Sequence, residues 1–240
     1  MGVRKRTETA AGDRRRSLFQ AVVLLGPPGA GKGTQARALA ARLRVPHLST
    51  GEMFRDHVAR GTELGARAKA IMEAGDLIPD EMVNEMVAGR LRNGDCGAGF
   101  VLDGYPRTVE QARILDQLLT KRRRRTVVIH LRVEYNELIQ RLTGRRSCPK
   151  CGRIYNTFLK PPVQEGMCDL DGAALARRHD DDEYVVRERL AAYVTQTRPL
   201  VDHYRRRKTF FDLDGGRPTE EITQTLDTIL RAGDVGRAGA

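Results

Sequence analysis

The chain has 240 residues, of which 40% are hydrophobic and 30% are charged, a balance that is ordinary for a globular protein in water. No apolar run approaches the roughly 18 residues of a membrane span, and the N-terminus lacks the apolar core of a secretory signal. We therefore expect a cytoplasmic protein with one substantial core and room for inserted lobes.

The net charge of +11 is concentrated in two segments. The first 19 residues carry six basic and two acidic side chains, and the run KRRRR at 121–125 adds five positive charges, which leaves +2 for the rest of the chain. Runs of like charge are usually solvated, and neither segment has the interleaved aromatic residues that stack on bases. We therefore expect a disordered basic leader over 1–19, no nucleic-acid partner and no membrane partner.

Predicted strands and helices alternate along the chain. The apolar run 18–25 predicts a strand buried on both faces, and a glycine-rich turn leads from it into a helix over 35–43. Further strands are predicted at 99–103, 126–133 and 209–214, and further helices at 108–120, 134–142, 182–207 and 219–231. This alternation predicts an α/β fold whose parallel sheet is covered on both faces.

Two segments depart from the alternation and are interpreted as inserted lobes. Residues 50–79 are helical and contain four glycines, and Asp80, which follows them, is a candidate N-cap. Residues 144–181 are rich in Cys, Pro, Gly and Asp. The predicted core then consists of residues 20–49, 80–143 and 182–231, followed by a flexible tail over 232–240.

The motif GPPGAGKGT at 26–34 lies between the first predicted strand and a helix, which is the context of a phosphate-binding loop. Its glycines let backbone N–H groups converge on phosphate oxygens, and Lys32 would reach the β- and γ-phosphates. Gly33 stands where the general motif has a magnesium-binding Ser or Thr, and Thr34 follows it, so we expect the metal to be held largely through water. A glycine-rich turn without a ligand is the alternative.

Five motifs occur in a characteristic order: GPPGAGKGTQA at 26–36, LSTGEMFR at 48–55, LDGYPRT at 102–108, RLTGRR at 141–146 and RRHDDDE at 177–183. Their order and spacing resemble the adenylate kinase family in its long-lid bacterial form, over about residues 20–231. The resemblance implies a P-loop nucleoside-monophosphate-kinase fold with a central parallel five-stranded sheet, an NMP-binding lobe over 50–79 and a lid over 144–181. It also implies a monomer that transfers the γ-phosphate of ATP reversibly to AMP, with Mg²⁺, and forms two ADP.

Phosphoryl transfer of this kind needs positioned cations rather than a general base. The resemblance implies that the catalytic cations are Lys32, Arg55, Arg107, Arg145, Arg178 and Arg189. It implies that ATP is bound by Gly29, Ala30, Gly31, Lys32, Gly33, Thr34, Arg141, Tyr155 and Arg217. It implies that AMP is bound by Thr50, Arg55, Leu77, Ile78, Gly104, Arg107, Gln111, Arg178 and Arg189.

Acidic residues near these motifs have supporting roles in this interpretation. Asp103 would anchor the waters around Mg²⁺, and Asp180 and Asp181 would hold the lid hinge by pairing with arginines rather than act as bases. Arg146 and Arg177 neighbour the chosen arginines, so an assignment shifted by one place stays open.

Cys148, Cys151, Cys168 and Asp171 give the pattern C-x2-C-x16-C-x2-D, which has the spacing of a four-ligand zinc knuckle. A disulfide is disfavoured because three cysteines are an odd number and a nucleotide enzyme belongs in a reducing compartment. Four protein ligands predict a structural Zn²⁺ that replaces the core a small lid cannot build. The alternatives are a lid with vestigial cysteines, or His179 as a substitute ligand, and Cys96 is expected to be an ordinary thiol.

Three other functions remain open at this stage. One is a kinase for another nucleotide pair, of the GTP:AMP or UMP/CMP type, although short-lid UMP/CMP relatives lack a 38-residue insertion such as 144–181. The second is a zinc-ribbon nucleic-acid-binding protein that uses the P-loop as a switch, and the third is a catalytically inactive homologue.

Overall fold

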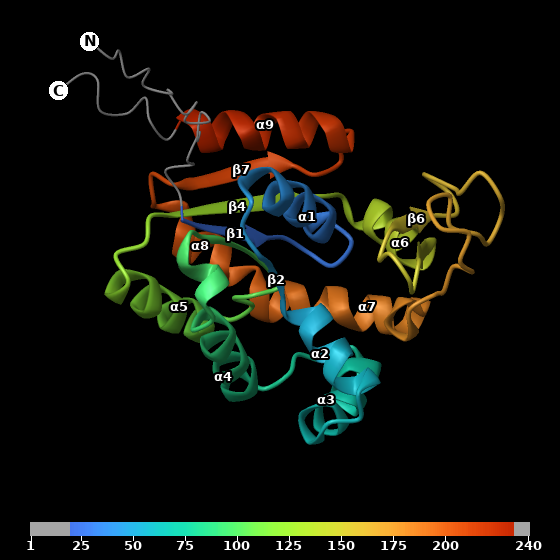
Figure 1. Ribbon diagram of the computed structural model, residues 1–240, viewed down its shortest axis with the longest axis horizontal. Helices are drawn as coiled ribbons and strands as arrows, with labels where there is room; N and C mark the ends of the chain where they lie inside the picture. Colours follow the sequence, from blue (N-terminus) through green and yellow to red (C-terminus); the bar gives the residue numbers. More distant parts are fainter. Residues whose placement is uncertain (1–19, 233–240) are drawn as a thin grey trace, which may run out of the picture.

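The structure, a computed structural model, describes residues 20–232. Figure 1 shows a central sheet with helices on both faces. The sheet has five parallel strands in the order β2 (His47–Ser49), β3 (Phe100–Asp103), β1 (Ala21–Leu25), β4 (Thr126–Arg132) and β7 (Phe210–Asp214). The predicted fold class is therefore confirmed. The predicted leader, and all of the predicted tail except Ala232, lie outside the described residues.

Nine α-helices are present in the part of the chain that the structure describes. They are α1 (Lys32–Leu43), α2 (Thr50–Ala59), α3 (Glu63–Ala74), α4 (Asp80–Leu91), α5 (Val109–Lys121), α6 (Tyr135–Thr143), α7 (Glu183–Ala192), α8 (Pro199–Arg205) and α9 (Thr219–Ala232). None of these helices is long and apolar enough to cross a membrane.

The side chains of β1 alternate between two apolar cores because successive residues of a strand point to opposite faces. Val22 and Leu24 belong to the core under α1, α6 and α9, whereas Val23 and Leu25 belong to the core under α4, α5 and α8. Val22 lies beside valines of both neighbouring strands, which leaves β1 in the middle of the sheet. The carboxyl end of β1 therefore opens into the centre of the molecule, where a ligand site of this fold class is expected.

The two predicted lobes have compact structures of their own. Within 50–79, α2 and α3 pack so closely that a Cβ on Gly65 would lie 2.2 Å from the carbonyl oxygen of His57. Within 144–181, β5 (Arg145–Ser147) and β6 (Ile154–Asn156) form an antiparallel pair. Figure 1 shows this lid beside α6 and α7, at one end of the molecule.

The helix predicted over 182–207 is interrupted. Residues Tyr193–Thr197 form a π-helical segment between α7 and α8, in which Arg198 N–H donates to the carbonyl of Tyr193, five residues back. Pro199 follows at the first position of α8 and has no N–H to continue an α-helical ladder. The wider turn therefore accommodates the proline without ending the helical path.

Asp80 is not the N-cap that was predicted. It is the first residue of α4, and Pro79 occupies the cap position. The Asp80 carboxylate instead accepts hydrogen bonds from Thr108 Oγ1 at 2.5 Å and from Gln111 Nε2 at 2.7 Å. It therefore ties the start of α4 to the start of α5, because a tertiary partner was available that the local pattern did not reveal.

Candidate active site and metal cluster

A cleft of about 690 Å³ opens at the carboxyl ends of β1, β2 and β3. Its walls come from the core, from residues 50–79 and from the lid, so three parts of the chain that are distant in sequence share one site. The residues predicted to bind nucleotide or magnesium all line it, and the neighbouring Arg146 and Arg177 do not. Gly26 and residues 28–34 of the predicted phosphate-binding loop form part of its lining.

The P-loop joins β1 to α1 and folds around the side chain of Lys32. Lys32 Nζ donates to the carbonyl oxygens of Gly26 at 2.7 Å and Pro27 at 2.8 Å. Gly31 precedes α1 and has a φ of +87°, a left-handed backbone conformation that favours glycine. Burial lowers the pKa of Lys32 to about 8, an effect that Asp103 opposes and Arg107 reinforces. A phosphate that replaced the two carbonyl contacts would therefore stabilise the charged amine.

Asp103 ends β3 and lies directly beside the P-loop. A Cβ on Gly33 would be 3.3 Å from Asp103 Oδ2, and His47 Nε2 lies 3.6 Å from the same oxygen. Although burial raises the pKa of Asp103, the contacts with His47 and Lys32 outweigh it and hold the pKa below its ordinary value. Asp103 is thus an ionised carboxylate next to the phosphate site, which is the kind of group that accepts hydrogen bonds from Mg²⁺-bound water.

Five arginines line the same cleft as Lys32: Arg55, Arg107, Arg145, Arg178 and Arg189. Burial, reinforced by repulsion from neighbouring arginines, lowers the pKa of Arg107 and of Arg178 to about 10 and also lowers the pKa of Arg55 and Arg189. A lowered pKa means that the protein destabilises the charged form of these side chains. A cluster of this kind is expected to bind a highly charged anion tightly.

Two adjacent carboxylates, Asp180 and Asp181, pair with two of these arginines. Arg189 Nη1 lies 2.9 Å from Asp180 Oδ2, and Arg145 makes a two-point ion pair with Asp181. The neighbouring arginines point elsewhere: Arg146 donates to the carbonyl of Thr143, and Arg177 donates to the backbone of Asp181. Arg145 and Arg178 line the cleft, whereas Arg146 and Arg177 do not.

The predicted AMP side of the cleft is built from the end of β3 and from residues 50–79 and the start of α5. Thr50 Oγ1 donates to the carbonyl of Gly104 at 2.8 Å, and Gly104 has a φ of +80°. Gln111 accepts from the backbone N–H of Arg107 at 2.8 Å and donates to Asp80, so its amide orients the AMP-side arginine. Leu77 and Ile78 add apolar surface to this end.

The predicted ATP side lies over α6 and the lid. Arg141 pairs with Glu137 one turn earlier at 2.5 Å, and Arg217 lies 3.9 Å from Asp214. The side chain of Tyr155 is buried, and its hydroxyl accepts from Asp169 N–H at 2.8 Å and lies 3.5 Å from Cys168 Sγ. The Tyr155 hydroxyl therefore belongs to the interior of the lid, and only the remainder of this residue faces the cleft.

The ligand atoms of Cys148, Cys151, Cys168 and Asp171 all lie within 4.8 Å of one another. Cys151 Sγ and Cys168 Sγ are 3.6 Å apart, close to the roughly 3.7 Å that two thiolates take around tetrahedral Zn²⁺ with bonds of about 2.3 Å. All four cysteines of the chain are free thiols, so no disulfide competes for these residues. His179 is not part of the group, and Cys96 is buried away from it, near Arg90. The donor set fits a closed, four-coordinate metal site.

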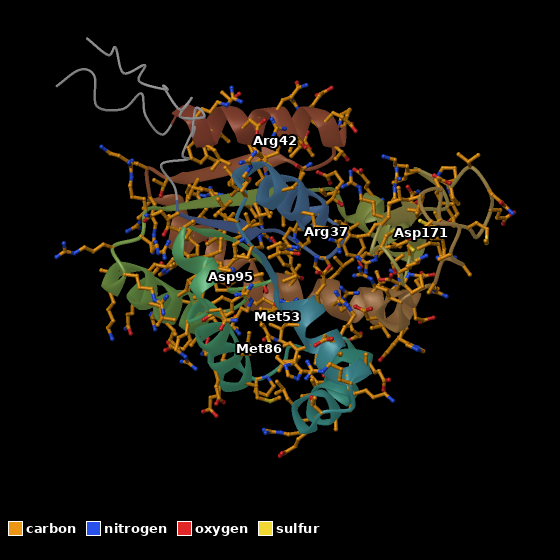
Figure 2. The ribbon with its side chains drawn as sticks, viewed as in Figure 1. Arg37, Arg42, Met53, Met86, Asp95 and Asp171 are labelled. Atoms are coloured by element: carbon orange, nitrogen blue, oxygen red, sulfur yellow. The ribbon has the colours of Figure 1, made fainter. Side chains whose placement is uncertain are left out.

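The sequence analysis did not single out two charged residues that line the cleft, Arg37 on α1 and Glu52 on α2, or His47 on β2, which lies beside Glu52. Arg37 contacts Glu52 and the lid, and His47 lies between Glu52 and Asp103. Figure 2 labels Arg37 on the part of α1 that faces the lid, in which Asp171 is labelled. The sequence alone does not distinguish Arg37 from a solvent-exposed arginine of a helix, because the partners of its side chain are set only by the tertiary fold.

Comparisons with known proteins agree with this geometry. A model of the family described as adenylate kinase matches residues 24–209. The chain is 48% identical over 211 residues to an adenylate kinase of Anaeromyxobacter dehalogenans, covering 87% of this chain and 98% of that protein. It is 46% identical to one of Pseudothermotoga lettingae (88% and 97% covered) and 43% identical to one of Fervidobacterium nodosum (87% and 96% covered). The chain therefore belongs to the adenylate kinase family and is a phosphotransferase of the nucleoside monophosphate kinase class.

Proposed function

We propose that the cleft transfers the γ-phosphate of ATP to AMP, and the reverse, through a set of six cations that meet around the P-loop. The observation that carries this proposal is the convergence of Lys32 with five arginines from the core, the NMP-binding lobe and the lid. Phosphoryl transfer spreads negative charge over the oxygens of a loose transition state, so positioned cations lower its free energy. The phosphate of AMP is already ionised at neutral pH, and no side chain has to remove a proton from it.

The roles of the cations follow from the elements that carry them. Arg55 on α2 and Arg107 after β3 would hold the phosphate of AMP, while Lys32 would hold the β- and γ-phosphates of ATP. Arg145 and Arg178 on the lid side, with Arg189 on α7, would surround the phosphoryl group in transit. The planar fork of arginine suits this task because it binds two phosphate oxygens at once.

Magnesium would arrive with ATP and neutralise part of the phosphate charge. Asp103 would hold its waters, since this carboxylate is ionised and lies beside Gly33. Thr50, Gly104 and Gln111, with Leu77 and Ile78, would receive the base and ribose side of AMP. Arg141 and Arg217 would lie against the adenine of ATP.

The lid and the NMP-binding lobe would close over the two nucleotides and exclude water, which otherwise competes with AMP as acceptor. A structural Zn²⁺ held by Cys148, Cys151, Cys168 and Asp171 would supply the stability that the small apolar cluster of the lid cannot. We expect the enzyme to act as a cytoplasmic monomer without a nucleic-acid or membrane partner.

The test is ADP formation from ATP and Mg²⁺ with each of AMP, GMP, CMP and UMP, before and after treatment with a chelator. Fast turnover with AMP alone supports the proposal, and activity retained at room temperature after chelation makes the cysteine cluster structural. If CMP or UMP were the preferred acceptor, the cations would keep their roles but the assignment of the AMP pocket would be wrong. Turnover with none of the four would contradict the proposed reaction.

A further inference from the structure

One guanidinium group touches both lobes of the cleft. Arg37, on the core helix α1, donates from Nη1 to the carbonyl oxygen of Gly152 in the lid at 3.1 Å. Its other terminal nitrogen, Nη2, pairs with Oε1 of Glu52 in the first turn of α2. The three residues therefore connect the core, the lid and the NMP-binding lobe at one point, and Figure 2 labels Arg37 on α1.

Both partners of Arg37 are held in place by their own elements. Gly152 has a φ of +72°, follows Cys151 of the metal cluster, and donates its N–H to the carbonyl of Cys148 at 3.0 Å. Glu52 lies in the capped first turn of α2, where its N–H donates to Ser49 Oγ. The two acceptors are therefore fixed relative to their lobes, and they meet the same guanidinium only when both lobes lie as they do in this structure.

We infer that Arg37 is a positioning residue that couples closure of the lid to closure of the NMP-binding lobe. This inference rests on the proposed function, because it assigns one nucleotide to each lobe. When AMP closes the NMP-binding lobe, Glu52 orients the Arg37 side chain and its Nη1 is already aimed at the lid carbonyl. Fixing the flexible Arg37 side chain costs conformational entropy. Closure of one lobe already fixes it, so closure of the second lobe does not incur this cost again. Each nucleotide therefore strengthens the binding of the other.

A simple surface ion pair would behave differently. The Arg37 and Glu52 side chains are 37% and 40% exposed, and pairs of this exposure add little to folding stability. We therefore expect removal of Arg37 to leave the melting temperature almost unchanged and to reduce the coupling between the two sites. Coupling is the readout that a merely structural role would not change, because it compares two binding reactions of the same folded protein.

The experiment measures coupling by titration calorimetry on the full chain. The dissociation constant of the non-hydrolysable ATP analogue AMPPNP with Mg²⁺ is determined without AMP and with saturating AMP, and the ratio of the two constants is the coupling factor. For the wild type we expect a factor of about 5 or more, within the usual range of coupling between sites. For Arg37→Gln we expect this factor to fall about threefold or more towards one.

The matched control is Arg42→Gln. Arg42 lies on the same helix and pairs with Asp227 of α9, so this variant also removes one charge and one ion pair, but both partners belong to the core. It should keep the coupling factor of the wild type. Glu52→Gln provides a second route to the same contact if Arg37→Gln does not fold, and it should also lower the coupling factor.

Steady-state kinetics supply an independent readout. Arg37→Gln should raise the KM for ATP and the KM for AMP together, with kcat unchanged or higher because the lobes open more readily. A large fall in kcat at unchanged KM would overturn the inference and place Arg37 in the chemical step instead.

The possible failures are distinguishable. If the wild type shows coupling that Arg37→Gln and Glu52→Gln both retain, the inference is wrong and the proposed function stands. If the wild type binds neither AMPPNP nor AMP, the proposed function is wrong and the inference falls with it.

Discussion

Arg145 and Asp181 form an ion pair that joins the two ends of the lid. Arg145 is the first residue of β5, and its Nε donates to Asp181 Oδ2 at 2.8 Å while Nη2 contacts the other carboxylate oxygen. The Asp181 side chain is fully buried. An arginine that we propose to be catalytic is thus oriented by a carboxylate at the opposite end of its own lobe.

We predict that Asp181→Asn will weaken both stability and catalysis. Removing one partner of a buried pair leaves a charge without compensation and costs about 3–5 kcal/mol. The freed Arg145 should also lose its orientation, so we expect kcat to fall about tenfold, which is about 1.4 kcal/mol of transition-state stabilisation. Thermal unfolding and steady-state kinetics measure the two effects. Glu183→Gln removes an exposed pair with Arg187 one turn away and should change neither quantity noticeably.

Replacing Lys32 should lower the activity of the enzyme and raise its thermal stability. Lys32→Met removes the cation that we propose holds the ATP phosphates and should lower kcat by a factor of about 10³, as loss of a comparable cationic contact does. The folded protein holds this amine with a pKa of about 8 against 10.5 for the free side chain, so the charge at pH 7 opposes folding. The variant should therefore melt a few degrees higher than the wild type at pH 7. A lower melting temperature would contradict this account, and Lys69→Met on the exposed face of α3 is the control.

The same lowered pKa predicts the pH dependence of ATP capture. Lys32 must be charged to bind phosphate, and in the free enzyme it loses its proton as pH rises through about 8. Because kcat/KM reports groups of the free enzyme, kcat/KM for ATP should fall above this pH. The decrease in kcat should begin at higher pH, since bound phosphate stabilises the charged amine. Coincident profiles for kcat and kcat/KM would exclude Lys32 as the titrating group.

His130 should make the fold sensitive to acid. It is buried on β4, with Nδ1 3.0 Å from Asp212 and Nε2 3.0 Å from the hydroxyl of Tyr193. Burial lowers the pKa of His130 although Asp212 opposes the shift. Below about pH 6.5 the unfolded chain takes up a proton that the folded protein does not, so stability falls as pH falls.

The corresponding measurement is the melting temperature between pH 7.5 and 5.5. His130→Gln should show a smaller decrease than the wild type, because the titrating group is gone. Tyr193→Phe removes one hydrogen bond of the same network without removing the imidazole, so it should keep the slope of the wild type. Equal slopes for His130→Gln and the wild type would show that other groups cause the acid sensitivity.

The cysteine cluster predicts about one tightly bound metal ion per chain. Chelation or Cys168→Ser should abolish metal binding and lower the melting temperature by about 5–10 °C, because the lid then lacks its main stabilising contact. Metal analysis and limited proteolysis within 149–170 would report the loss directly. Asp171→Cys should keep the metal, since thiolate is also a zinc ligand. Glu165→Gln, at an exposed site of the lid, is the control, and equal metal content in Cys168→Ser and the wild type would contradict the assignment.

Four of the five strands of the sheet were predicted from the sequence pattern. Three of them, β1, β3 and β4, are buried along most of their length and read as apolar runs, whereas β7 is a partly exposed edge strand. The fifth, β2, consists of His47, Leu48 and Ser49, and three residues of mixed polarity carry no period. The sequence pattern also did not predict the interruption between α7 and α8 or the true partners of Asp80. Asp80 has partners in a distant segment, Thr108 and Gln111, whereas the interruption precedes Pro199, a local feature of the helix.

The amino-acid sequence by itself determined the phosphate-binding loop, the order of strands and helices, the family and the residue types at the site. These features depend on short motifs and on periodicity, which are properties of neighbouring residues. Only the tertiary structure decided which groups meet: Arg37 with the carbonyl of Gly152, 115 positions apart, and, among the arginines expected to pair with Asp181, Arg145, 36 positions apart. Such pairs depend on how the lid, the NMP-binding lobe and the core pack against one another, and no local pattern of a chain rich in arginine distinguishes them from solvated charges.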